Sequence, residues 1–233
     1  LGVVKMEVCR SQRPNISFLK KVRALTKRKK IILIFDECTS GFRENLGGMH
    51  MKYKIYPDMV ILGKALGNGY AINCVLGNLK TMQHAKSSFI SSTFWTERIG
   101  PTAALKTLEV MQKEKSWKKI NIIGNKIIKE WKKISKKNNI KIKIEGIPSL
   151  CGFRFLSKHE RELNTLFTQE MLKKGFLATN NIYVSTKHDN KVLRKYFVEF
   201  NRVFQSIKNL DTKEKILAKM ETSTKENKFS RLN

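Results

Sequence analysis

The sequence predicts an α/β fold, and two observations support this. Short apolar runs that end in Gly or in a carboxylate alternate along the chain with helical patterns, as expected of strands and helices packed in layers. The 233 residues are 41% hydrophobic and include 13 Phe, enough for a substantial core. Such a composition excludes a largely disordered chain, and the length suits one medium domain or two small ones.

The first part of the chain alternates predicted strands and helices. VVKMEV (3–8) has the pattern of a buried strand, and ISFLKKVRALTKRK (16–29) has that of a helix. IILIFDE (31–37) is a continuous apolar run that ends in two carboxylates, which predicts a fully buried strand. The next predicted elements are short strands over 59–63 and 73–77 and a helix over 100–114, with Pro101 in its first turn.

The second part predicts an α+β unit. Its first segment carries large apolar residues at helical spacing with lysines between them, which is typical of a helix with a buried face and a solvated lysine face. These residues are Trp117, Ile120, Ile127, Trp131 and Ile134. The following predicted elements are strands over 140–146, 150–156 and 182–185, helices over 160–174 and 189–208, and a polar surface tail over 221–233. We place a domain boundary near Ser116, which gives domains 1–115 and 116–233.

The charge balance is strongly basic. Lys and Arg number 47 against 19 Asp and Glu, a formal net charge of +28. Taken alone, this is typical of a nucleic-acid-binding protein. Most of the excess is Lys spread along helical faces, and Arg clusters with interleaved aromatic residues are missing. We therefore favour a compositional bias and expect no nucleic-acid partner, with a basic nucleic-acid-binding protein as the alternative from another class.

Other classes of protein are not supported. The four cysteines form no C-x-x-C pair, so neither a zinc ribbon nor a disulfide framework is indicated, and we expect no metal site. No apolar run reaches the roughly 18 residues of a spanning helix, so we expect no membrane partner. LGVVKMEV has no signal-peptide pattern, which favours a reducing cytoplasm. Because the chain starts with Leu1 inside a predicted strand, we expect it to be the C-terminal piece of a longer protein.

Three segments place polar residues where strands end, the edge at which α/β sheets bind ligands. In IFDECTSGFR (34–43), Asp36 follows an apolar strand and needs a cationic or hydrogen-bonded partner. A helix cap or a buried ion pair would also explain such a carboxylate.

The second segment, PDMVILGKALGNGY (57–70), places Lys64 directly after a predicted strand, among Gly63, Gly67 and Gly69. The glycines permit tight turns and leave room for a bulky group beside the amine. A lysine in such a position can be a nucleophile toward carbonyls, although a surface lysine in a turn is the alternative.

The third segment, SSTFWTERIGP (91–101), places hydroxyl groups before a helix that starts with proline. Hydroxyls and the free N–H groups of a helix N-terminus can bind an anion, and an ordinary helix cap is the alternative. Lys64 comes 28 positions after Asp36, and Thr93 comes 29 positions after Lys64. Together they provide what pyridoxal 5'-phosphate requires: a carboxylate for the ring nitrogen, an amine for a Schiff base and a donor for the phosphate.

These segments resemble those of the class III (subgroup II) pyridoxal-phosphate aminotransferases, especially the glutamate-1-semialdehyde aminomutase branch. The similarity covers IFDECTSGFR, ILGKALGNGY, SSTFWTERIGPTAAL and the terminal FSRLN, and so nearly the whole chain. The resemblance implies a fold-type I enzyme, of which this chain is the C-terminal portion of the large domain (1–115) and the C-terminal small domain (116–233).

The resemblance also implies roles for individual residues. Asp36 would pair with the pyridinium nitrogen, and Lys64 would form the Schiff base. Cys38 stands where a residue, commonly Val, packs on one face of the ring. Thr93 would reach the phosphate of the cofactor held mainly by a neighbouring subunit, which implies a homodimer. Glu7 resembles a glutamate near the site, although Val8 replaces the proline that usually follows.

Two features of the family have no match here. Its glycine-rich phosphate-binding turn and its ring-stacking aromatic residue belong to positions before Leu1, so we expect this chain alone to be poorly active. The arginine that clamps a substrate carboxylate in some members has no evident counterpart. Arg154 is the nearest candidate, and a surface residue at a strand edge is its more ordinary interpretation.

We therefore predict an enzyme that transfers an amino group between a small-molecule amino donor and a carbonyl acceptor through Lys64. An intramolecular aminomutase uses the same residues and stays open as an alternative. A non-catalytic remnant that keeps only the dimer scaffold is a further alternative from another class.

Overall fold

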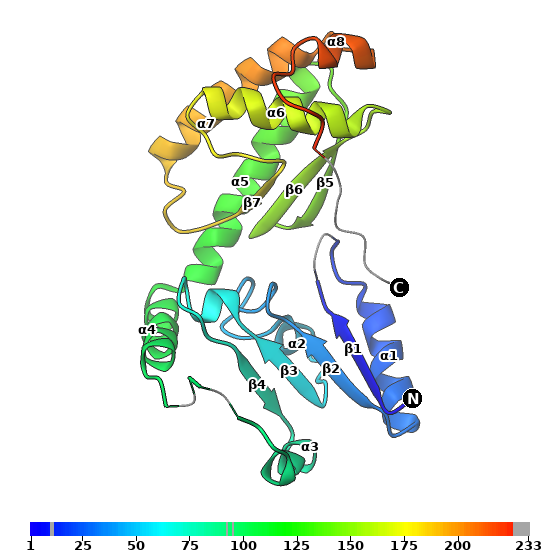
Figure 1. Ribbon diagram of the computed structural model, residues 1–233, viewed down its shortest axis with the longest axis vertical. Coiled ribbons are helices and arrows are strands. Elements are labelled where there is room, and N and C mark those ends of the chain that lie inside the picture. The colour runs from blue at the N-terminus through cyan, green and yellow to red at the C-terminus, as the bar shows by residue number, and fades with distance from the viewer. Residues whose placement is uncertain (10–11, 92, 95, 226–233) are drawn as a thin grey trace. The chain divides into compact units, whose positions relative to one another are not determined.

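The computed structural model describes residues 1–9, 12–91, 93–94 and 96–225. It divides into two compact units, Leu1–Asn121 and Ile122–Asn233, and each is described by itself. Both combine helices with a β-sheet, which confirms the predicted α/β class (Figure 1). The terminal FSRLN and most of the predicted polar tail lie outside the described residues.

The first unit is built on a four-stranded sheet of order β1-β2-β3-β4. The first three strands are parallel, and the fourth is antiparallel to the third. The strands are β1 (Val3–Glu7), β2 (Ile32–Asp36), β3 (Met59–Leu62) and β4 (Cys74–Gly77). The helices are α1 (Ile16–Arg28), α2 (Met49–Tyr53), α3 (Leu79–Met82) and α4 (Ile99–Glu114), with 3-10 turns η1 (Lys64–Leu66) and η2 (Gln83–Ser87).

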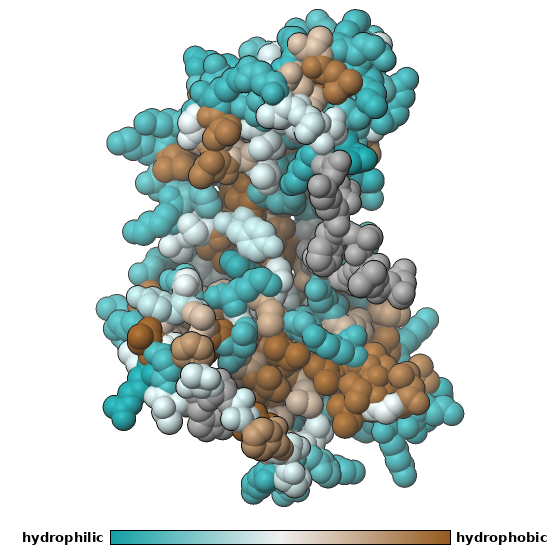
Figure 2. All heavy atoms as spheres, viewed as in Figure 1, coloured by the Kyte–Doolittle hydropathy of each residue, from teal (hydrophilic) through white to brown (hydrophobic). Residues whose placement is uncertain are grey.

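The two faces of this sheet differ. Leu33 and Phe35 of β2 are fully buried, whereas Ile32, Ile34 and Asp36 on the other face are only half-buried. The predicted full burial of 31–37 is therefore wrong, because in this chain only one face of β2 is completely covered. Figure 2 shows hydrophobic atoms at the surface over the region of β1 and β2. Asp36 thus lies on the more open face of the sheet.

The second unit packs helices against a three-stranded antiparallel sheet of order β5-β6-β7. The lysines of α5 are exposed, and Ile120, Ile127, Trp131 and Ile134 are buried, as predicted for its two faces. Trp117 is half-buried. Helix α5 (Ser116–Lys137) has its first residues in the first unit. The other elements of the second unit are β5 (Ile142–Ile147), β6 (Leu150–Phe155), α6 (Glu160–Lys173), β7 (Asn181–Tyr183), α7 (Asn190–Ile207) and α8 (Lys213–Leu217).

Aromatic side chains form the centre of the second unit. The ring of Phe153 lies 5.1 Å from Trp131 and 5.7 Å from Phe200, both in edge-to-face arrangements. Such pairs contribute roughly 0.5–1.5 kcal/mol each beyond the burial of their area. The Trp131 indole N–H donates to the Tyr196 hydroxyl at 3.0 Å, so the polar atom of this buried tryptophan is satisfied.

Gly124 lets α5 approach the β5–β6 turn closely. A Cβ at this position would lie 1.9 Å from the carbonyl oxygen of Pro148, and backbone cannot move as a flexible side chain can. We expect Gly124→Ala to lower the free energy of unfolding by about 1–3 kcal/mol, the usual cost of overpacking. Urea unfolding measures this, with Asn125→Ala on the exposed side of α5 as the control. Equal stability of the two variants would contradict the close approach.

The twelve elements expected from the sequence are present, and the eleven that were predicted with bounds begin and end within two residues of those bounds. α2, α3, α8 and the 3-10 turns were not predicted, because segments this short have no room for an amphipathic repeat. In the described part of the chain, no helix is both long and apolar enough to cross a membrane.

Candidate active site

Asp36 and Lys64 lie at the same edge of the first sheet. β2 and β3 are parallel and pair Asp36 with Ile61, and the Glu37 N–H donates to the Ile61 carbonyl at 2.8 Å. Lys64 follows the end of β3 by two residues. The carboxyl ends of these neighbouring strands therefore bring the predicted carboxylate and amine to one place.

The Asp36 carboxylate is held by two donors. Its Oδ2 pairs with the Lys5 ammonium at 3.0 Å, and its Oδ1 accepts from the Cys38 N–H at 3.2 Å. Partial burial acts to raise the pKa of Asp36, but the hydrogen bonds from Lys5 and Cys38 outweigh it and hold the pKa below its usual value. Asp36 is thus an ionised acceptor at neutral pH.

Lys64 adopts a left-handed backbone conformation, with a φ of 46°. Residues other than glycine adopt this region at a cost of roughly 1–2 kcal/mol, and other turns of the described chain, such as that at Lys54, use it too. The Lys64 Nζ donates to the Thr39 hydroxyl at 2.8 Å, so the amine points toward the loop after β2. Gly63 before it packs closely against Asn73, because a Cβ there would lie 2.2 Å from the Asn73 side-chain oxygen and that side chain would have to move.

Cys38 contacts the Asp36 carboxylate and is near enough to Lys64 to be influenced by its charge. Burial, followed by its hydrogen bond to Asp36, raises the pKa of its thiol, and the charge of Lys64 acts on it in the opposite direction. A thiol with a raised pKa is neutral at physiological pH and is a poor nucleophile. The environment of Cys38 therefore suits packing against a ligand better than covalent chemistry.

The loop that carries Cys38 and Thr39 is anchored by the buried carboxylate of Glu37. This side chain is fully buried and accepts from the His50 N–H at 3.1 Å, from the Met49 N–H and from the Ser40 hydroxyl at 3.4 Å. The His50 Nδ1 lies 2.7 Å from the same carboxylate. These bonds tie both ends of the loop together and fix the residues that face Lys64.

Thr93 is not brought to these residues within the described chain. It is exposed, and none of the hydrogen bonds or ion pairs among described residues joins it to Asp36, Cys38 or Lys64. Free N–H groups were expected at the start of α4, but two of them are already bonded. The Glu97 carboxylate accepts from the Ile99 N–H at 2.5 Å and from the Gly100 N–H at 3.1 Å.

Glu7 and Arg154, the other two candidates from the sequence, lie in different units. Glu7 lies beside Asp36 in the parallel pairing of β1 with β2. Arg154 belongs to the second unit and is half-exposed, with ion pairs to Glu145 at 3.6 Å and to Glu160 at 3.8 Å. Its guanidinium is thus engaged within its own unit, in keeping with a surface residue at a strand.

Sequence reasoning did not single out Lys5 and Thr39, both of which contact the site. In β1, Lys5 and Glu7 are the charged residues, and the other three residues are apolar. Because they are two positions apart, Lys5 and Glu7 lie on the same face of the strand. That alternation was a usable signal. Thr39 carried no such signal, because only the conformation of the loop directs its hydroxyl toward Lys64.

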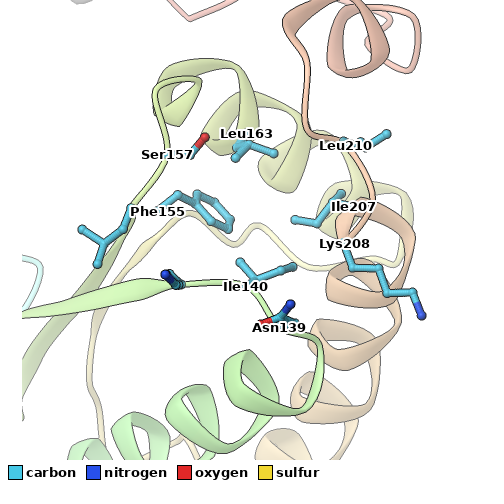
Figure 3. Close-up of a pocket in the computed structure, with 10 residues that line it drawn as sticks. Asn139, Ile140, Phe155, Ser157, Leu163, Ile207, Lys208 and Leu210 are labelled. Atoms are coloured by element: carbon cyan, nitrogen blue, oxygen red, sulfur yellow. The ribbon is translucent and has the colours of Figure 1, made fainter.

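The cavities of the described chain include two that differ in their lining. One of about 570 Å³ is lined by Leu62 and Leu76, on the face of the first sheet opposite Asp36, and by Leu66 of η1. Another of about 270 Å³ lies in the second unit, where Phe155, Ile140 and Ile207 point toward its centre while the Lys208 amine points away (Figure 3). Binding sites usually direct a few polar groups toward a ligand, so the second cavity is a less suitable site than the edge with Lys64.

Comparison with known protein families shows to which family this chain belongs. Residues 12–201 match the family model described as Aminotransferase class-III, which covers Asp36, Lys64 and Thr93. The chain belongs to the class III aminotransferase family. This confirms the family suggested by the three segments.

Relatives of this class III aminotransferase chain include both transferases and mutases. It is 31% identical over 186 residues to the 3-aminobutyryl-CoA aminotransferase of Cloacimonas acidaminovorans, covering 79% of this chain and 44% of the relative. It is 28% identical over 214 residues to the glutamate-1-semialdehyde 2,1-aminomutase of Wigglesworthia glossinidia brevipalpis, covering 84% and 49%. The chain thus spans about half the length of these curated relatives.

Solved structures share the fold of this class III aminotransferase chain. The FumI protein of Sphingopyxis sp. MTA144, solved in its PLP internal aldimine form, superposes with a TM-score of 0.84 at 20% identity, covering 88% of this chain and 51% of FumI. An omega-transaminase from Sphaerobacter thermophilus gives a TM-score of 0.78 at 20% identity, covering 87% and 51%. The predicted fold class is therefore confirmed.

Proposed function

We propose that this chain contributes the Schiff-base lysine and the ring-nitrogen carboxylate to a pyridoxal-phosphate-dependent amino transfer. The observation that carries the proposal is the juxtaposition of the Lys64 amine and the Asp36 carboxylate at the ends of two parallel, hydrogen-bonded strands. The names of the curated relatives, an aminotransferase and an aminomutase, support the same chemistry.

The residues fit this cofactor. Asp36 is ionised and lies on the more open face of the sheet, as an acceptor for a protonated ring nitrogen must. The exposed Lys64 offers an amine to an aldehyde, and the neutral Cys38 thiol can pack against a ring between the two. When bound, pyridoxal phosphate supplies an electron sink for the carbon that carries the transferred amino group.

Each residue has a distinct task in this proposal. Asp36 holds a proton at the ring nitrogen through its negative charge. The Lys64 amine is the nucleophile for the cofactor's aldehyde, and once displaced it moves a proton at the reacting carbon. Thr39 accepts a hydrogen bond from the Lys64 Nζ and so orients the amine toward the loop that carries Cys38.

We also propose that the enzyme is a homodimer in which Thr93 binds the phosphate of the partner's cofactor. The segment around Thr93 exposes several large apolar side chains, among them Phe89 at 97% and Ile99 at 64%. Contiguous exposed apolar side chains commonly mark an interaction surface.

The two domains fit this assignment. We propose that 1–115 is the C-terminal portion of the cofactor-binding large domain and that 116–233 is the small domain. The first compact unit ends slightly later, at Asn121, whose side chain donates to the Arg43 carbonyl of the same unit at 2.6 Å. A reducing cytoplasm is the proposed compartment, in keeping with four free cysteines.

The proposal can be tested without knowing the substrate. We expect borohydride treatment of the protein with pyridoxal phosphate to fix the cofactor on Lys64, as identified by peptide mass spectrometry. The same treatment should leave the exposed Lys54 unmodified, although this lysine has the same left-handed backbone. Modification spread evenly over exposed lysines would contradict the proposal.

An aminomutase is the second candidate, favoured by the similarity to glutamate-1-semialdehyde aminomutases. The same side chains would serve both reactions, so a labelling experiment must separate them. An amino donor that carries isotope-labelled nitrogen is offered with and without a carbonyl acceptor. Transfer of the label to the acceptor indicates a transferase, whereas movement of the label within one molecule indicates a mutase.

A further inference from the structure

Lys5 is an unexpected neighbour of the proposed ring-nitrogen carboxylate. It is the central residue of β1, and the parallel pairing of β1 with β2 places Lys5, Glu7 and Asp36 on one face of the sheet. The Lys5 Nζ lies 3.0 Å from the Asp36 Oδ2. The Lys5 side chain is 55% exposed and that of Asp36 is 23% exposed, so the pair is partly screened by solvent.

Both oxygens of the Asp36 carboxylate have a partner, which restricts rotation of the side chain. Lys5 pairs with Oδ2, and the Cys38 N–H donates to Oδ1. The other titratable groups nearby are Glu7 beside it in β1, the Cys38 thiol and Lys64, whose charge reaches that thiol. Among the described residues, Lys5 is thus the cation in direct contact with the carboxylate that would hold the ring nitrogen.

We propose that Lys5 is a positioning residue that orients the Asp36 carboxylate and weakens its hold on the proton of the cofactor's ring nitrogen. The inference rests on the proposed function. A carboxylate that already faces one ammonium group is a weaker base toward a second cation, because the two positive charges repel each other. Lys5 would thereby limit how strongly the ring nitrogen is kept protonated.

The ion pair is tested first in the cofactor-free chain. Lys5→Met keeps the length of the side chain and removes its charge, so we expect the pKa of Asp36 to rise by about half a unit to one unit, within the range of partly exposed pairs. NMR titration of the side-chain carboxyl carbons measures this, with Asp36→Asn to assign the resonance. Lys5→Arg should restore the wild-type value.

Lys20→Met is the matched control. Lys20 is an exposed lysine of α1, and its substitution removes the same unit of charge without touching Asp36. We expect no change in the pKa of Asp36 in this variant. An equal shift in both variants would show that net charge, and not the ion pair, is responsible, which would overturn the inference.

The second measurement concerns the cofactor. We expect Lys5→Met to bind pyridoxal phosphate about twofold to fivefold more tightly than wild type, as loss of a repulsion of this size implies. A shifted pKa of Asp36 with unchanged cofactor affinity would overturn the inference. Borohydride trapping at Lys64 in the wild type separates this result from a failure of the proposed function, because trapping does not depend on Lys5.

Discussion

Replacement of Lys64 by alanine is expected to abolish covalent attachment of the cofactor and to reduce turnover by on the order of a thousandfold or more. The reason is that the Lys64 amine is the proposed nucleophile and proton carrier, and alanine offers neither. Some cofactor should stay bound through non-covalent contacts. Borohydride trapping, visible absorbance of the bound cofactor and initial rates in the full-length protein measure the three effects.

Lys54→Ala is a closely matched control. Lys54 is an exposed lysine whose backbone φ of 54° resembles the 46° of Lys64, so both variants place alanine in the left-handed region at similar cost. We expect Lys54→Ala to retain attachment and turnover. Unchanged covalent attachment in Lys64→Ala would show that another lysine carries the cofactor.

Replacement of Asp36 by asparagine should leave covalent attachment intact and reduce turnover by about a hundredfold or more, a barrier increase of roughly 2.7 kcal/mol. Asparagine has nearly the same shape, and its side-chain oxygen can still accept from the Cys38 N–H. It has no negative charge with which to keep the ring nitrogen protonated. Trapping at Lys64 and turnover, measured on the same preparation, separate the two effects.

Asp58→Asn distinguishes a catalytic from a structural carboxylate. Asp58 precedes β3 and pairs with Arg23 at 2.7 Å, and it also accepts from the Leu33 N–H at 2.9 Å. We expect this variant to lose thermal stability while turnover per folded molecule stays normal. If Asp36→Asn behaved in the same way, Asp36 would have a structural role.

The positions of Asp36 and Lys64 followed from the sequence because strand ends are visible in it. One apolar run stops at the carboxylate of Asp36, and another stops at Gly63 and Lys64. If the two strands are parallel, Asp36 and Lys64 must lie at the same edge of the sheet. The apolar face of α5 was equally visible, since a helix of this length repeats its pattern several times.

The side chains that contact Asp36 and Lys64 could not be predicted from the pattern of strand ends. The bond from Lys64 to Thr39 depends on the path of a loop, and that path depends on Glu37, whose buried contacts lie twelve and thirteen positions away. The half-exposure of Ile32 and Ile34 was also hidden, because an apolar run does not reveal which of its faces another layer covers. Tertiary packing decides both.

The pairing of β2 with β3 also has a consequence for how such chains can change in length. Asp36 and Lys64 are held by the register of two strands, not by the residues that connect them in sequence. The backbone of Phe42 and Gly47 closes a small loop within that connection, through a hydrogen bond of 2.7 Å. An insertion between these two residues would lengthen only the outer loop, at a small entropic cost, and leave the Glu37 anchor and the strand register in place. Natural variants of this protein can therefore differ in the number of residues between Asp36 and Lys64 while the distance between the Asp36 carboxylate and the Lys64 amine stays the same.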